Sequence, residues 1–280
     1  IREQILPAQH PDLADVYMNL GNNYAYLARY DSALIYYERC RVIWEQILPP
    51  QHPDLATVYM NMATTYLGLT QYNTALAYYD RCRAIREQML PPQHPSLAGL
   101  YMNIAIVYDS LTQYDTALAY YERCRVIREQ ILPTKHPDLA SLYLNIANTY
   151  TNIAQYDTAL AYYERCRAIR EQVLPPQHPG LAVLYINMAE LYNNQSQFSK
   201  AKIYIDKSIN IFQQIFPAEH PHLRQAIELQ QQLEQSLQAT QIPQTHPNTI
   251  SYGDKTDDFL PNNTNPQNSK DIKKQVYLYP

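Results

Sequence analysis

The sequence is poor in glycine and has no excess of basic residues. Its 280 residues include five glycines, and its formal net charge is −4. Five scattered glycines cannot form the glycine-rich loop that holds a nucleotide phosphate. Lysine and arginine are interspersed with acidic residues, so no continuous basic surface exists for a nucleic acid backbone. We therefore expect no nucleic acid partner and no phosphate-binding active site.

Long apolar runs and clustered cysteines are also missing. No run of 18 apolar residues occurs, so we expect no membrane insertion. The four cysteines are Cys40, Cys82, Cys124 and Cys166, spaced 42 residues apart. Cysteines at equivalent positions of stacked helical units are too far apart for a disulfide or a shared metal. The sequence thus predicts no metal and no cofactor, and four unpaired thiols favour a reducing, cytoplasmic location.

What the sequence does contain is a repeat. The dipeptide His-Pro recurs every 42 residues, beginning at His10, His52, His94, His136, His178 and His220. A fixed period of this length indicates supersecondary units that cannot bury their apolar faces alone and stack into a continuous core. The period therefore predicts the fold class before any motif does.

One unit has the pattern of two helices. Apolar residues at helical spacing predict a first helix over residues 12–28 and a second over 31–48. Pro49 and Pro50 end the second helix. His52-Pro53 then opens the next unit, with proline at a first helical position, where a missing N–H costs nothing. We interpret each histidine as a turn or capping residue, and the tyrosines and cysteines at fixed positions as core.

The chain divides into four predicted parts. Residues 1–6 repeat the sequence of residues 127–132, so we interpret them as the end of a truncated upstream repeat. Five repeats follow over residues 7–219. Residues 220–238 form a capping helix, in which Gln230, Gln231 and Glu234 replace core residues. Residues 239–280 form a polar tail that we expect to be disordered.

Neither catalysis nor strong ion pairing is indicated by the remaining motifs. Serine, histidine and aspartate do not fall in a known nucleophile setting, so the chain is not expected to be an enzyme. Arg41 and Glu45 stand at i and i+4, as do their equivalents in later units. We expect this stripe to be solvated and weakly stabilising.

The first helix of each unit also has a face opposite its core stripe. At 100° per residue this face lines the concave side of a curved array. Asparagine side chains can both donate to and accept from the backbone of an extended peptide. The candidate peptide-binding groove consists of Asn19, Asn22, Tyr26, Asn61, Thr64, Asn103, Asn145, Asn148 and Asn187. The alternative is that these asparagines serve only the structure of the repeat.

A family resemblance follows from these residues. Tyr17, Leu20, Gly21 and Tyr24, followed by Ala33 and Tyr37, resemble the tetratricopeptide signature. The 42-residue unit is similar to the arrays of kinesin light chains, over roughly residues 1–237. The resemblance implies an all-α, right-handed superhelical solenoid of helix-turn-helix repeats that acts as an adaptor. Kinesin light chains take up acidic peptides, yet the groove face has no Lys or Arg, and only the asparagine half of a chaperone carboxylate clamp is present.

Three functional interpretations remain open. The first is a scaffold that binds a protein or peptide partner in the groove. The second is a targeting or regulatory arm of a larger enzyme, such as an ADP-ribosyltransferase, whose catalytic domain preceded residue 1. The third is a structural spacer without a ligand. A kinesin heavy chain partner would require a heptad coiled coil upstream.

Overall fold

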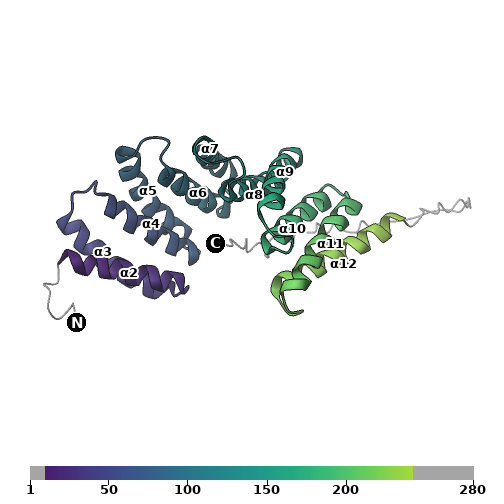
Figure 1. The fold of residues 1–280 in the computed structure, drawn as a ribbon, viewed down its shortest axis with the longest axis horizontal. Coiled ribbons are helices and arrows are strands. Elements are labelled where there is room, and N and C mark those ends of the chain that lie inside the picture. Colours follow the sequence, from purple (N-terminus) through teal and green to yellow (C-terminus); the bar gives the residue numbers. More distant parts are fainter. Residues whose placement is uncertain (1–9, 242–280) are drawn as a thin grey trace, which may run out of the picture. The chain divides into compact units, whose positions relative to one another are not determined.

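The structure, a computed structural model, describes residues 10–241, which form eleven α-helices and no strand. Consecutive helices form five pairs, which a single helix follows; Figure 1 shows them in order along the chain. The first helix of each pair, called an A helix below, is α2 (Pro11–Tyr26), α4 (Pro53–Gly68), α6 (Pro95–Ser110), α8 (Pro137–Asn152) or α10 (Pro179–Asn194). The second, or B helix, is α3 (Tyr30–Ile47), α5 (Tyr72–Met89), α7 (Tyr114–Ile131), α9 (Tyr156–Val173) or α11 (Phe198–Ile215). The single helix α12 covers Pro221–Gln241.

Each A helix begins at its His-Pro dipeptide. The imidazole Nδ1 of His10 accepts the backbone N–H of Asp12 at 3.1 Å, and His52 does the same for Asp54 at 3.3 Å. The cap satisfies one of the donors that a helix start leaves unpaired. The same bond recurs at His94, His136, His178 and His220. The interpretation of these histidines as capping residues is confirmed.

The predicted end of the A helix, at residue 28, is two residues too late. The first A helix ends at Tyr26, and Ala28 has a φ of 54°, in the left-handed region. The N–H of Arg29 reaches back to the carbonyl of Tyr24 at 2.9 Å, which closes the helix end. The other four turns have a residue with positive φ at the same place: Thr70, Thr112, Ala154 and Ser196. The spacing of apolar residues does not predict this turn, because the residue with positive φ is an alanine, threonine or serine and not a glycine.

The B-helix residues of the predicted core stripe are buried, whereas Leu20 and Tyr24 of the A helix are half-buried. Tyr37, Cys40 and Ala33 of the first pair are almost fully inaccessible, as are their equivalents in the next three pairs. A Cβ atom on Gly21 would lie 2.5 Å from the Tyr37 ring, so the two helices approach most closely where the side chain is absent. Burial raises the pKa of the Cys82 thiol to about 11. The cysteines are therefore buried core residues, and burial disfavours their reactive thiolate form.

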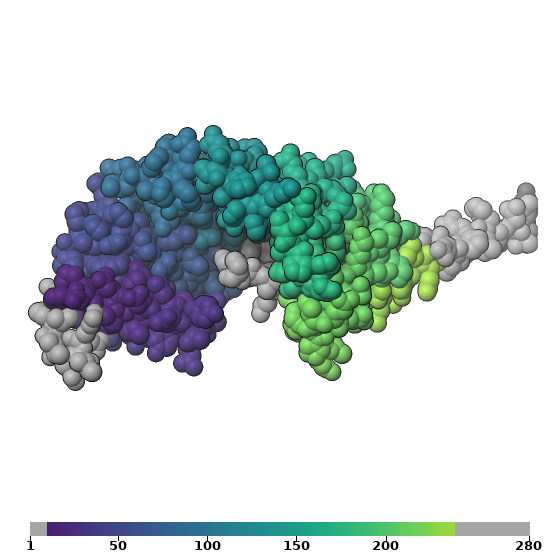
Figure 2. All heavy atoms as spheres, in the orientation of Figure 1, coloured from purple at the N-terminus to yellow at the C-terminus, as the bar shows by residue number. Residues whose placement is uncertain are grey.

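Successive units stack through both helix layers, but unequally. Each A helix contacts the next A helix, whereas successive B helices approach each other less closely. In a stack of helix pairs, the layer with the closer contacts lies on the inner side of the curve. In Figure 2 the colours of residues 10–241 follow one another along the array in chain order. The A helices thus form the concave surface of the all-α solenoid.

The fifth unit and the cap differ from the other units. Helix α11 keeps its full length although Ile205 and Ser208 replace the tyrosine and cysteine of earlier units. Helix α12 buries Leu223, Ala226 and Leu233 against it. Of the three polar residues that the sequence analysis assigned to the outer face of a cap, Gln231 and Glu234 are exposed and Gln230 is half-buried and bonds Asp206 at 2.6 Å.

Some predicted features lie beyond these residues. Helix α12 reaches Gln241, three residues past the predicted boundary at 238. The predicted upstream fragment (1–6) and the part of the predicted tail from 242 onward lie outside the described residues. None of the helices between residues 10 and 241 is long and apolar enough to cross a membrane.

Candidate functional site: the concave face of the A helices

All nine residues of the candidate groove lie on A helices. Tyr26 is 90% exposed at the end of α2. Asn19 and Asn22 are also exposed, and the six residues from α4, α6, α8 and α10 are half-buried.

Four of the asparagines are engaged with each other across unit boundaries. The amide of Asn61 donates to Asn22 Oδ1 at 2.9 Å, and that of Asn187 donates to Asn148 Oδ1 at 3.0 Å. The two accepting oxygens also receive hydroxyls from the B helices: Tyr37 donates to Asn22 at 2.9 Å, and Tyr163 donates to Asn148 at 2.7 Å. These amides therefore join neighbouring units, so the structural alternative holds for much of their hydrogen-bonding capacity.

The central units lack this network. Unit two has Thr64 where Asn22 stands in unit one, and its hydroxyl bonds Tyr79 at 3.1 Å. At the equivalent position of unit three is Ile106, which is only 3% exposed and whose side chain cannot form a hydrogen bond. Asn103 and Asn145 consequently make no side-chain hydrogen bond with any residue between 10 and 241, and neither does Asn19. Two half-buried, unpaired amides remain in the middle of the surface.

Asp109 is a residue of this surface that the sequence analysis missed. It is 5% exposed at the contact of α6 with α8, where its Oδ1 accepts the hydroxyl of Thr149 at 2.7 Å. The equivalent residues of the other units are Ala25, Leu67, Thr151 and Asn193. In the sequence, Asp109 stands out only because the equivalent position of every other unit has a neutral residue.

The glutamates of the outer Arg–Glu stripe are partly exposed, as the sequence predicts, but the stripe also joins neighbouring units. Arg41 is only 18% exposed and bonds both Glu38 and Glu45. Glu45 also accepts the hydroxyl of Tyr59, in the next unit, at 2.8 Å. Burial and this bond raise the pKa of Tyr59 to about 12.

The bond recurs at later unit boundaries. It joins Tyr101 to Glu87, Tyr143 to Glu129 and Tyr185 to Glu171. The stripe therefore connects each unit to its neighbour, a role that contacts within one helix could not reveal.

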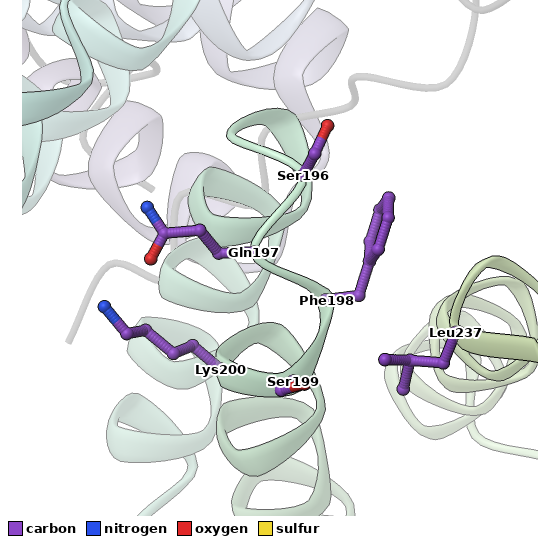
Figure 3. A pocket seen from close by; sticks show the side chains of 6 residues that line it. All are labelled: Ser196, Gln197, Phe198, Ser199, Lys200 and Leu237. Atoms are coloured by element: carbon purple, nitrogen blue, oxygen red, sulfur yellow. The ribbon is translucent and has the colours of Figure 1, made fainter. Parts of the chain in front are cut away.

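The hollows in the surface lie at unit junctions. One is lined by Ser196, Gln197, Phe198, Ser199, Lys200 and Leu237. Figure 3 shows Phe198 on the side of α11 that faces Leu237 of α12, while Gln197 and Lys200 point away. A second hollow recurs one unit earlier, around the turn at Ala154. Their recurrence identifies them as gaps between stacked turns.

The described residues also lack a metal site. No group of three or more His, Cys, Asp or Glu side chains in residues 10–241 is arranged to hold a metal ion.

Comparisons with known proteins agree with this architecture. The tetratricopeptide repeat family matches residues 12–88, 70–130, 96–172 and 138–214. A candidate kinesin light chain of Podosopora anserina with nearly identical TPR-like repeats has 22% sequence identity and a TM-score of 0.63, over 72% of this chain and 96% of its own. BtubC from P. vanneervenii has 20% identity and a TM-score of 0.63, over 89% of each chain.

These identities show a shared fold and nothing finer. Curated proteins give no significant match. The matched repeats together span residues 12–214, which is well over half of the sequence. Since the family model matches more than half of the chain and the paired helices cover the same residues, the chain belongs to the tetratricopeptide repeat family.

Proposed function

We propose that this protein is an interaction scaffold that holds an extended peptide, or an extended segment of a partner protein, against its A helices. The observation that supports the proposal most directly is the pair of unpaired amides at Asn103 and Asn145. A half-buried amide without a partner loses hydrogen bonds that a bound peptide backbone can restore. Both amides lie on stacked helices, so they are held in place before the ligand arrives.

The likeness to kinesin light chain repeats supports an adaptor role in the cytoplasm. The four buried free cysteines are compatible with that reducing compartment. Stacked helix pairs supply a rigid, repeated surface, which suits the binding of a partner protein. We accordingly propose a non-enzymatic function.

The experiment is a peptide-binding screen with matched variants. A random peptide library is passed over the whole chain and over the double variant Asn103→Ala plus Asn145→Ala. The control is Gln88→Ala plus Gln130→Ala, which removes two exposed amides with the same spacing from the B helices. Loss of two hydrogen bonds to the ligand should weaken binding by about tenfold or more in the groove variant, since each is worth roughly 0.5–1.5 kcal/mol.

The control should bind as the unaltered protein does. Absence of saturable binding to any peptide would overturn the proposed function. Equal affinities of the groove variant and the unaltered chain would show that the peptide binds elsewhere.

A further inference from the structure

We propose that a second copy of this chain binds the edge of the array at which each B helix passes into the next A helix. This edge, called the loop edge below, is separate from the groove residues, so the inference goes beyond the proposed function. It comes from a row of exposed apolar residues and from two charges that interrupt it.

Each unit presents three consecutive apolar residues at the loop edge. In the first unit these are Ile47, which is the last residue of α3, then Leu48 and Pro49. Ile47 and Pro49 are exposed, and Leu48 is half-buried. The last B-helix residue is 37–51% exposed in all five units, where it is Ile47, Met89, Ile131, Val173 or Ile215. The loop edge therefore carries an apolar ridge of five similar steps.

Outside this ridge, no position has an exposed large apolar residue in every unit between residues 10 and 241. Ile35 has such an equivalent only at Ile203, and Val42 only at Val126. Exposed apolar residues that occur singly are ordinary on a soluble protein, whereas larger exposed patches mark binding surfaces. The ridge has the character of such a surface.

The ridge is almost free of charge. Together with its flanking residues it covers 46–51 and the equivalent segments 88–93, 130–135, 172–177 and 214–219. The only charged residues in these segments are Lys135 and Glu219, at the position where the other units have Gln51, Gln93 and Gln177. Both are exposed, and neither forms an ion pair with any residue between 10 and 241. One cation and one anion thus interrupt a neutral ridge.

The two charges are placed as a twofold symmetric pair requires. Lys135 precedes Gln177 by one 42-residue unit, and Glu219 follows it by one. When two copies pack ridge to ridge with the twofold axis at unit four, the third unit of each copy meets the fifth unit of the other. Each Lys135 then meets Glu219 of the second copy, so the ion pair forms twice. At the axis, Val173 meets Val173 of the second copy.

The alternative is a pair of arrays that run in the same direction. Every unit would then meet its own equivalent, so Lys135 would face Lys135 and Glu219 would face Glu219. Like charges across an interface oppose binding, whereas opposite charges fix its register. Charge therefore favours the antiparallel pair. Because that pair joins only three units of each copy, we expect a modest dissociation constant of about 10 μM.

The test is the oligomeric state of the whole chain, measured by sedimentation velocity from about 1 to about 100 μM. We expect a reversible equilibrium between monomer and dimer. Val173→Arg places two like charges at the axis and should weaken dimerisation about tenfold or more. The control, Ile47→Arg, puts the same side chain on the ridge of the first unit, outside the contact, and should leave dimerisation unchanged.

Charge reversal at the two exposed positions tests the register. In Lys135→Glu, glutamate meets glutamate at both symmetric contacts, and in Glu219→Lys, lysine meets lysine. Each variant alone should therefore dimerise about tenfold or more weakly than the unaltered chain. A mixture of the two variants should form heterodimers about as tightly as the unaltered chain forms homodimers, because each contact then joins a glutamate to a lysine.

Three results would overturn the proposal. The first is a chain that stays monomeric at about 100 μM. The second is equal weakening by Ile47→Arg and Val173→Arg, because added charge at any part of the ridge would then explain the loss. The third is a mixture of the charge-reversed variants that associates no better than each variant alone, because the two charges would then not meet. Peptide binding in the groove does not depend on any of these results.

Discussion

Ser208 is predicted to be the weakest core residue of the fifth unit. It occupies the position of the buried cysteines in the first four units and is 0% exposed. Its hydroxyl is the one buried side-chain polar atom among residues 10–241 that makes no hydrogen bond. A buried hydroxyl without a partner has lost its bonds to water and gained none in return.

The expected gain in stability on replacing Ser208 can be calculated from the cost of burying its hydroxyl. Leaving a buried polar group unsatisfied costs about 1–3 kcal/mol. The substitution Ser208→Cys replaces the hydroxyl with a thiol that behaves as a small apolar group. Cys166 shows that the equivalent position accommodates this side chain at 0% exposure. We therefore expect Ser208→Cys to stabilise the fifth unit by about 1–2 kcal/mol.

Hydrogen exchange is the appropriate assay, because a repeat array opens locally and the gain should appear in one unit. Amide protection in α11 should rise about tenfold per 1.4 kcal/mol. The reverse change, Cys166→Ser, should lower protection in α9 by a similar factor. Unchanged or reduced protection of α11 in Ser208→Cys would refute the reasoning, as would a neutral effect of Cys166→Ser.

Three further predictions concern the unit boundaries and the cap. Tyr101→Phe removes the hydroxyl that donates to Glu87 at 2.9 Å, and should lower the free energy of unfolding by about 1 kcal/mol in chemical denaturation. Burial, and then the charge of His220, lower the pKa of His222, so its neutral form is favoured in the folded state. The resulting stability is present above the unfolded pKa of about 6.5 and is lost as the pH falls below it. Protection factors of α12, which are exchange rates corrected for the intrinsic rate at each pH, should decrease there, and His222→Gln should remove that dependence. Deleting residues 221–280 should reduce solubility more than deleting 242–280, since only the first exposes the apolar face of the fifth unit.

The period and the core stripes were predictable because both are local. A 42-residue spacing and a 3.6-residue periodicity are properties of the chain itself, and they determine which side chains of each helix turn inward. The same holds for the histidine caps, where the acceptor and the N–H are two residues apart. The helix end at Tyr26 was missed because Ala28, a residue that rarely has positive φ, forms the turn.

Contacts between units could not be predicted from one unit. Glu45 was interpreted through its neighbour Arg41, yet its bond to Tyr59 depends on how the next unit stacks. The prediction of the groove had the same limit, because it did not include hydrogen bonds between units. Helical geometry placed Asn22 and Asn61 on the correct face, but their hydrogen bond joins residues 39 positions apart.

The departures from the repeat are therefore more informative about the groove than the repeated asparagine is. Of the five equivalent asparagines, Asn61 and Asn187 donate to the neighbouring unit, whereas the other three make no side-chain hydrogen bond with any residue between 10 and 241. Where Ile106 interrupts the series, Asn145 is left without its neighbour's carbonyl oxygen, while the fold of the unit is unchanged. Such a position retains hydrogen-bonding capacity that the fold does not use, and a ligand can use it. The third and fourth units are accordingly where substitutions should separate binding from stability.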